Sequence, residues 1–240
     1  MQSVEIHRAS NAQDVAEQAA TEILDRLSKA QGRYNLCLTG GTVGILTLKH
    51  LAEKPDLQNL NLQNVHFWFG DERFVAKDSP DRNANQARDA LLSKLSISPN
   101  QIHEFPSLDE TEDVANAAKL FENHLVDFFE EAKPRMDLTL LGMGPDGHVA
   151  SLFPGHEYPE QLIVFEENSP KPPAQRISMS YALLNSSREI MFVVSGIDKA
   201  EAIESVHKNP ACDLPAAKVG ATEQTIWIVD EAAGAAFWSC

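Results

Sequence analysis

Met136 to Pro154, which read M-D-L-T-L-L-G-M-G-P-D-G-H-V-A-S-L-F-P, are the stretch that decides the fold. The apolar run from Met136 to Leu141 has the length and character of a buried parallel strand. Two glycines and a proline then end the strand in a turn. Asp146 and His148 follow this turn directly. Because ligands of open α/β sheets bind at the carboxyl ends of the strands, a carboxylate and an imidazole here predict a site of chemistry.

A structural interpretation of the same two residues is equally well supported by this stretch alone. An Asp after a Gly-Pro turn is often a helix N-cap, and a single His is often a structural hydrogen-bond donor. Two further turns of the same kind elsewhere in the chain favour the functional interpretation.

The composition is that of an ordinary globular protein, with 43% hydrophobic and 23% charged residues among 240. This length allows one large α/β domain with a substantial core. The net charge of −15 disfavours nucleic acid and anionic membranes as partners. A small anionic ligand remains compatible with the sequence if the few basic residues are concentrated around it.

Targeting features are lacking in the sequence. No apolar segment approaches the roughly 20 residues of a membrane span, and residues 1–10 lack the layout of a signal peptide. The three cysteines, Cys37, Cys212 and Cys240, are widely spaced. We therefore expect free thiols and a cytoplasmic protein, present as a monomer or a weak homo-oligomer.

Predicted strands and helices alternate along the whole chain. Strands are predicted at 34–38, 65–69, 136–141, 176–180, 189–194 and 225–229, with a weaker candidate at 102–105, and helices at 11–29, 45–53, 83–94, 111–131, 198–207 and 230–237. Four prolines between Gly155 and Gln175 indicate a surface loop or lid. The alternation predicts a single α/β domain over residues 1–240, with a mainly parallel central sheet and helices on both faces.

A second glycine turn, T-G-G-T-V-G at Thr39 to Gly44, follows the strand at 34–38. Backbone N–H groups of Gly40, Gly41 and Thr42, together with the start of the next helix, are suited to bind a phosphate. A lone Gly-Gly pair is nevertheless more often a plain turn. The turn is neither a Walker loop nor G-x-G-x-x-G, which disfavours nucleoside triphosphates and dinucleotides.

Charged residues complete the expected site. Asp71, Glu72 and Arg73 directly follow the buried strand at 65–69, where charges are unusual unless they line a cleft or a solvated loop end. Arg176 begins a strand after the proline-rich loop. Lys199 lies at the start of a helix, where a cation is unfavourable for the helix dipole. Together these cations and the Gly-Gly turn predict an anion site.

Several motifs resemble the signatures of the 6-phosphogluconolactonase family. They are T-G-G-T at 39–42, D-E-R-F-V at 71–75, R-N-A at 82–84, G-M-G-P-D-G-H-V-A-S-L-F-P at 142–154, R-I-S-M-S at 176–180 and S-G-I-D-K-A around Lys199. The resemblance covers nearly the whole chain, in order. It implies a Rossmann-like three-layer fold and hydrolysis of 6-phosphogluconolactone to 6-phosphogluconate in the oxidative pentose phosphate pathway, with neither a metal nor an organic cofactor. The family's first loop commonly reads S-G-G-S-T-P, whereas Val43 and Gly44 stand here in place of Thr-Pro.

Lactone opening requires an activated water, stabilisation of an oxyanion and a proton for the leaving ring oxygen. We expect His148 to act as the general base, with Asp146 orienting its ring or helping to hold the water. We expect Arg73 to stabilise charge near the carbonyl, and Asp71 to fix the orientation of Arg73. The 6-phosphate of the sugar-phosphate lactone would bind to Gly40, Gly41, Thr42, Arg176 and Lys199.

Four alternatives remain open. Deaminases of the same fold resemble this chain, but they carry Asn where it has Asp146 and D-E-Y where it has Asp71-Glu72-Arg73. A non-catalytic sugar-phosphate sensor would need a DNA-binding segment, and none is recognisable. Ser151 as nucleophile lacks the G-x-S-x-G elbow. A metal on Asp146, His148 and His156 lacks a known ligand motif.

Overall fold

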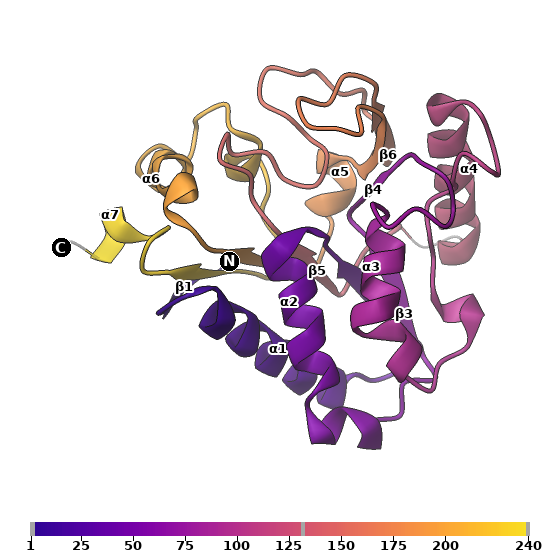
Figure 1. The fold of residues 1–240 in the computed structure, drawn as a ribbon, viewed down its shortest axis with the longest axis horizontal. Helices are drawn as coiled ribbons and strands as arrows, with labels where there is room; N and C mark the ends of the chain where they lie inside the picture. The colour runs from indigo at the N-terminus through magenta and orange to yellow at the C-terminus, as the bar shows by residue number, and fades with distance from the viewer. Residues whose placement is uncertain (1–2, 131–132, 239–240) are drawn as a thin grey trace.

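A six-stranded parallel sheet forms the centre of the computed structural model, which describes residues 3–130 and 133–238 (Figure 1). Its strands are β1 (Ser3–Ala9), β2 (Tyr34–Leu38), β3 (Val65–Phe69), β5 (Leu138–Leu141), β8 (Glu189–Val194) and β9 (Gln224–Asp230). They lie in the order β1-β9-β8-β5-β2-β3. The strand order reverses direction around β5 and β2, so the site predicted after these strands lies where an open α/β sheet binds ligands.

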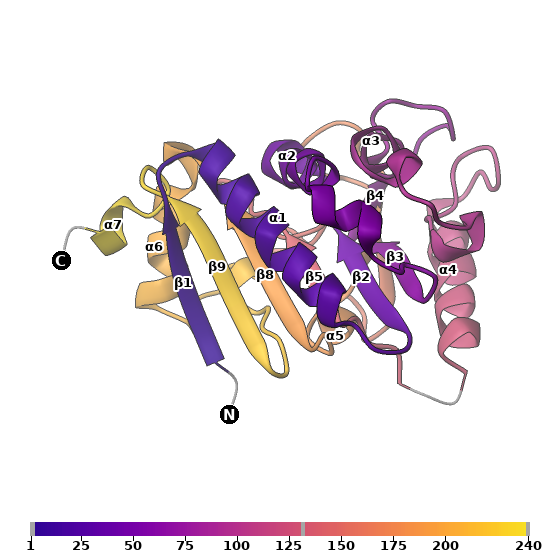
Figure 2. The same ribbon diagram turned by 90° about the horizontal axis from the view of Figure 1, so that it is seen from below.

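Helices cover both faces of this sheet, as predicted. Figure 2 shows α1 and α2 over one face, with α5 and α6 on the other. The bounds are α1 (Ala12–Lys29), α2 (Gly41–Ala52), α3 (Asn83–Ala90), α4 (Val114–Phe129), α5 (Tyr181–Leu184), α6 (Ala200–Lys208) and α7 (Ala235–Trp238). Asn11 caps α1 as predicted, because its side chain accepts hydrogen bonds from the N–H groups of Gln13 and Asp14.

Several helix ends differ from the prediction. α2 begins at Gly41 rather than 45, because packing against α1 outweighs the poor helix propensity of glycine and β-branched residues. α4 begins at Val114, since Asp113 is its cap. α7 begins at Ala235 rather than 230, because β9 continues to Asp230. The predicted end of α4 at Glu131 lies outside the described residues.

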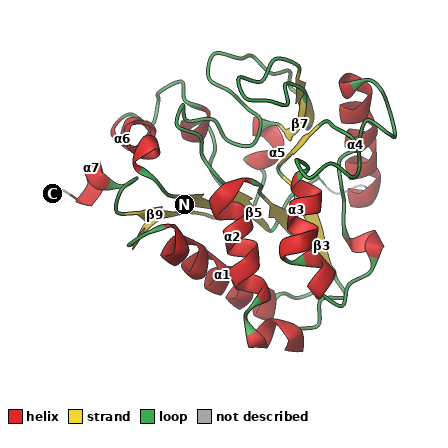
Figure 3. Ribbon diagram, in the orientation of Figure 1, coloured by secondary structure: helices red, strands yellow, loops and turns green. Residues whose placement is uncertain are grey.

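A second, antiparallel sheet was not predicted. It contains β4 (Asp71–Arg73), β7 (Arg176–Met179) and β6 (Ile163–Glu166), in the order β4-β7-β6 (Figure 3). The predicted loop at 155–175 therefore contains a strand, because its prolines flank the β-branched segment I-V-F-E and do not interrupt it. The candidate strand at 102–105 is reduced to a single bridge between Ile102 and Phe67.

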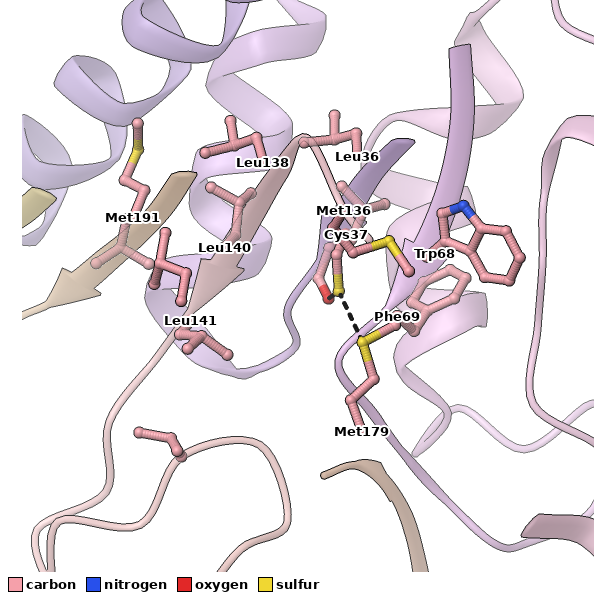
Figure 4. Close-up of a cluster of buried hydrophobic side chains, with 14 of the residues drawn as sticks. Leu36, Cys37, Trp68, Phe69, Met136, Leu138, Leu140, Leu141, Met179 and Met191 are labelled. Atoms are coloured by element: carbon pink, nitrogen blue, oxygen red, sulfur yellow. Dashed lines mark hydrogen bonds between the residues drawn. The ribbon is translucent and has the colours of Figure 1, made fainter. Parts of the chain in front are cut away.

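The core around β5 fixes the position of the turn that follows it. All four residues of β5 are buried, and Figure 4 shows Leu138, Leu140 and Leu141 packed among side chains of the neighbouring strands. Burial of each leucine contributes about 2 kcal/mol. Cys37 of β2 contacts Met179 of β7 at 3.8 Å between their sulfur atoms, so the core also joins the two sheets. Burial raises the pKa of the Cys37 thiol.

Cys37 and Cys212 are free thiols, whereas Cys240 lies outside the described residues. Over residues 3–130 and 133–238, no helix has the length and apolar character needed to cross a membrane.

Candidate active site

A cavity of about 320 Å³ lies at the carboxyl ends of β2, β5 and β8, next to β4 and β7. It brings together all the predicted site residues except Asp146: the lining includes Gly40, Gly41, Thr42, Asp71, Arg73, His148, Arg176 and Lys199. Asp146 lies directly behind His148. Residues from five parts of the chain, within 39–44, 71–83, 142–153, 171–176 and 193–199, thus converge on one space.

The Gly-Gly turn presents the start of α2 to this cavity. Gly40 is the N-cap residue, and neither an acidic side chain nor a side-chain cap occupies the first turn. Gly41 has a φ of 79°, which favours glycine. The first N–H groups of the helix therefore remain available to an anion, where the helix dipole also favours negative charge.

Gly44, which departs from the family pattern, fits together with Thr39. A Cβ atom at position 44 would lie 2.6 Å from the Thr39 methyl carbon and 2.9 Å from the Thr39 carbonyl oxygen. The family pattern has Ser, which is smaller than Thr by one methyl group, at the position of Thr39, and Pro at the position of Gly44. The extra methyl group of Thr39 thus occupies the space that is left open by Gly44.

Asp146 and His148 form a hydrogen-bonded pair on the turn after β5. His148 Nδ1 lies 2.5 Å from Asp146 Oδ1, and the turn is closed by a hydrogen bond from the Gly144 N–H to the His148 carbonyl at 2.9 Å. Burial alone would raise the pKa of Asp146, but the charge of His148 and its hydrogen bonds outweigh burial and lower it. Asp146 is therefore ionised at neutral pH, and its carboxylate accepts a hydrogen bond from the Nδ1–H group of His148. In the neutral imidazole, Nε2 is then the nitrogen that carries the lone pair.

Glycine is required at position 144 because the His148 ring approaches the backbone closely there. An added Cβ atom would lie 2.1 Å from both Cε1 and Nδ1 of His148 and 2.6 Å from Asp146 Oδ1. On another side, the Phe153 ring packs against the imidazole, with 4.9 Å between ring centroids. These contacts hold the ring in one place at the cavity wall.

The three charges that follow β3 point in different directions. Asp71 and Arg73 line the cavity, but Glu72 is fully buried and accepts hydrogen bonds from the N–H groups of Asn83 and Ala84 at the start of α3. Burial raises the pKa of Glu72 to about 7, against the effect of Arg82 and the backbone donors. Glu72 thus fixes α3 and does not face the cavity.

The structure does not show Asp71 bonded to Arg73, the contact that we expected. Asp71 instead accepts hydrogen bonds from Ser151 Oγ at 2.6 Å and from Asn83 Nδ2 at 3.1 Å. Arg73 Nη1 donates to Asn83 Oδ1 at 2.7 Å and to the Asp81 carbonyl at 2.8 Å. Asn83 therefore stands between the two expected partners.

Four cations line the cavity, against one carboxylate, that of Asp71. Arg176 is 7% exposed, and its guanidinium donates to the carbonyls of Pro173 and Lys171. Burial lowers the pKa of Arg176, an effect that Asp71 opposes and Arg73 reinforces. Lys199, in the short 3-10 turn before α6, pairs with Asp198. In a chain of net charge −15, this concentration of positive charge marks a site for an anion.

Sequence reasoning missed Asn83 and Lys171. Asn83 lay inside the quoted R-N-A motif, so the motif was visible although its role was not. Lys171 lies in the proline-rich segment and lines the cavity from there. Lys171 is close to Arg176 in the sequence, and its carbonyl accepts a hydrogen bond from the Arg176 guanidinium, but a lysine between prolines on a predicted surface loop gave no sign that it lines a cavity.

The geometry does not support the alternative of Ser151 as nucleophile or that of a bound metal ion. Ser151 is 1% exposed, and its hydroxyl is committed to Asp71. His156 bonds to Glu166 at 2.5 Å, away from the Asp146–His148 pair. Among the residues that the structure describes, no group of three or more His, Cys, Asp or Glu side chains is arranged to hold a metal ion.

The fold and the cavity define an α/β protein with a cavity that is lined by four cations and lies beside a hydrogen-bonded Asp–His pair. Comparison with known proteins places it more narrowly: the chain belongs to the glucosamine-6-phosphate isomerase/6-phosphogluconolactonase family, whose pattern it matches over residues 10–227.

Individual relatives agree with this assignment. The chain is 38% identical to a 6-phosphogluconolactonase of Mycobacterium leprae, over 86% of each chain, and 38% identical to one of a Nostoc species, over 88% of each. Among solved structures, the 6-phosphogluconolactonase of Thermotoga maritima superposes with a TM-score of 0.80 at 26% identity, covering 95% of this chain and 99% of the other. The predicted Rossmann-like fold and family are thereby confirmed.

Proposed function

We propose that this protein hydrolyses 6-phospho-D-glucono-1,5-lactone to 6-phosphogluconate, a reaction of the oxidative pentose phosphate pathway. The observation that carries the proposal is the Asp146–His148 pair at the wall of a cavity lined by four cations. The relatives named above support the same activity. Asp146 and Arg73, where deaminases carry Asn and Tyr, favour the lactonase over a deaminase.

His148 activates the attacking water. Because Asp146 is ionised and holds Nδ1–H, Nε2 accepts a proton from water as it adds to the lactone carbonyl. The C1–ring oxygen bond then breaks, and the protonated imidazole returns the proton to the leaving ring oxygen. A hydrogen-bonded carboxylate stabilises the imidazolium that exists between these two steps.

The cations and the α2 terminus hold the two negative regions of the reacting substrate. Arg176, Lys199 and the N–H groups of Gly40 to Thr42 bind the 6-phosphate, which places the carbonyl next to His148. Arg73, fixed through Nη1, lies on the cavity wall from which it stabilises the developing oxyanion. Binding and chemistry thus use different cations of one cavity.

The test is lactone hydrolysis by the native protein, His148→Ala and Arg176→Ala, after subtraction of spontaneous opening. We expect His148→Ala to lower kcat by more than about 10²-fold, in the range for a general base. Arg176→Ala should raise KM more than it lowers kcat, because it removes binding of the remote phosphate. His7→Ala and Arg8→Ala, on the edge strand β1, are the matched controls and should behave as native. Native-like turnover of His148→Ala would refute the assignment of the base.

A further inference from the structure

The Asn83 side chain contacts three parts of the cavity wall at once. It is 2% exposed and lies at the first position of α3. Its Nδ2 donates to the backbone carbonyl and the carboxylate of Asp71, at 2.9 and 3.1 Å. Its Oδ1 accepts from Arg73 Nη1 at 2.7 Å. Both Nδ2 and Oδ1 of the Asn83 amide are thus hydrogen-bonded within the site.

The third contact is with the Gly-Gly turn. A Cβ atom at Gly40 would lie 2.0 Å from Asn83 Oδ1, so the amide fills the space that a side chain at position 40 would need. The backbone of Asn83 is fixed as well, because its N–H donates to the buried Glu72 at 2.6 Å. Position and orientation of the amide are therefore both determined.

Only an amide satisfies these neighbours. Asp71 presents two acceptors, which require a donor, and Arg73 presents a donor, which requires an acceptor. A carboxylate would oppose Asp71 at about 3 Å, where like charges prevent full ionisation of both groups. An aliphatic side chain would leave Arg73 held by the Asp81 carbonyl alone, since Arg73 Nε is buried without a partner among the described residues.

We infer that Asn83 is a positioning residue for the hydrolysis: it holds the Arg73 guanidinium at the place where the oxyanion forms, and it keeps Asp71 from neutralising that guanidinium. The inference rests on the proposed function and adds to it a residue that does not touch the reacting atoms. It also gives a reason for the Asn in the R-N-A motif, because neither an ionised Asp nor an Ala reproduces both hydrogen bonds.

The isosteric variant Asn83→Asp tests this through a pH profile. The charged groups bonded to Asn83 are Asp71, Glu72 and Arg73 of β4, and Arg176 of β7 is the register partner of Arg73 and lines the same cavity. When protonated, the carboxyl imitates the amide, donating to Asp71 and accepting from Arg73. When it ionises, it pairs with Arg73 and neutralises the charge needed for the oxyanion. We therefore expect kcat of the variant to be near native at low pH and to fall about tenfold or more, relative to native, as the pH rises from 5.5 to 8.

Asn85→Asp is the matched control, because it is the same chemical change two residues further along α3. Asn85 bonds to the carbonyls of Lys77 and Ser79 and does not line the cavity. Its pH profile should overlay that of the native protein. A constant ratio of Asn83→Asp to native kcat across this pH range would overturn the positioning role.

A double-mutant cycle gives a second, independent readout. Asn83→Ala alone should lower kcat about tenfold or more, whereas in an Arg73→Met background it should lower kcat less than threefold, because its target is already gone. Equal effects in both backgrounds would contradict action through Arg73. Binding of 6-phosphogluconate, measured by calorimetry at pH 5.5, should change less than threefold in Asn83→Asp, because the protonated carboxyl keeps the hydrogen bonds of the amide and leaves the contact with Gly40 intact.

Failure of the proposed function and failure of the inference about Asn83 alone would give different results. A native protein that binds 6-phosphogluconate without hydrolysing the lactone would overturn the proposed function and this inference with it. Native turnover combined with additive Asn83 and Arg73 effects would overturn the inference alone.

Discussion

Replacing Gly144 with alanine should abolish most of the activity while leaving the fold intact. The added Cβ would lie 2.1 Å from Cε1 and Nδ1 of His148, whereas ordinary contact begins at 3.4 Å. The imidazole must therefore move by about 1.3 Å. Such a shift breaks the 2.5 Å contact between His148 Nδ1 and Asp146 Oδ1 and moves Nε2 away from the attacking water.

The expected magnitude follows from that displacement. A misplacement of about 1 Å at a reacting group costs on the order of 10²-fold in rate, which corresponds to about 2.7 kcal/mol in the activation free energy. The colliding atoms belong to side chains near the surface of the cavity, so the ring can move without disturbing the core. We expect kcat to fall about 10²-fold and the free energy of unfolding to change by less than about 1 kcal/mol.

Gly142→Ala is the matched control, two residues earlier in the same turn. A Cβ atom there meets no protein atom within 4 Å, so stability should be close to native, and because it leaves the His148 ring in place, any effect of the methyl group in the cavity should be on KM and not on kcat. The assay is initial-rate hydrolysis of 6-phosphogluconolactone, with urea unfolding of each variant measured in parallel. Equal kcat values for the two alanine variants would refute the reasoning, since they would show that the position of the His148 ring does not limit the reaction.

Two further predictions concern residues outside the base pair. Ser151→Ala should retain kcat within about tenfold in the same assay, because the hydroxyl bonds to Asp71 and is not the nucleophile; a loss beyond 10⁴-fold would restore the serine mechanism. His103 is buried and hydrogen-bonded to His66 and His124, and burial, followed by the charges of His124 and His66, lowers its pKa from 6.5 to about 3. Between these values the unfolded chain binds the proton and the folded protein does not, so His103 makes the free energy of unfolding fall as the pH drops from 6.5 towards 3, by at most about 1.4 kcal/mol per pH unit. Chemical unfolding at several pH values should therefore show a shallower slope for His103→Phe than for native protein or His7→Phe, and an unchanged slope would count against a neutral His103.

Much of the fold was predictable because strands buried on both faces are distinct in sequence. The runs at 34–38, 65–69 and 189–194 match β2, β3 and β8 at both ends. β1 was missed, since S-V-E-I-H-R-A alternates with charged residues and lies exposed at the edge of the sheet. β6 was missed because it is short and surrounded by prolines and glutamates. The partner of β1, which is β9, is distant in the sequence, whereas β6 pairs with β7, the next strand along the chain.

Some residues of the candidate site could likewise be predicted from the sequence, and others could not. Residues on glycine turns after predicted strands, such as Gly40 and His148, were predictable because their positions follow from the topology. Asn83 was not singled out, because its importance lies in contacts with Asp71 and Arg73 across the second sheet.

The pairing of β4 with β7 has a consequence for how the protein responds to its ligand. Arg73 and Arg176 are directly opposed in the register of these antiparallel strands, and like charges in that arrangement oppose each other. The charge of Arg73 accordingly lowers the pKa of Arg176, in addition to the effect of burial. A dianion bound between the two side chains would reduce this repulsion. At one hundred times its dissociation constant, any ligand adds about 2.7 kcal/mol to the free energy of unfolding, so the folded lifetime of this protein in a cell would rise with the supply of the metabolite that it consumes.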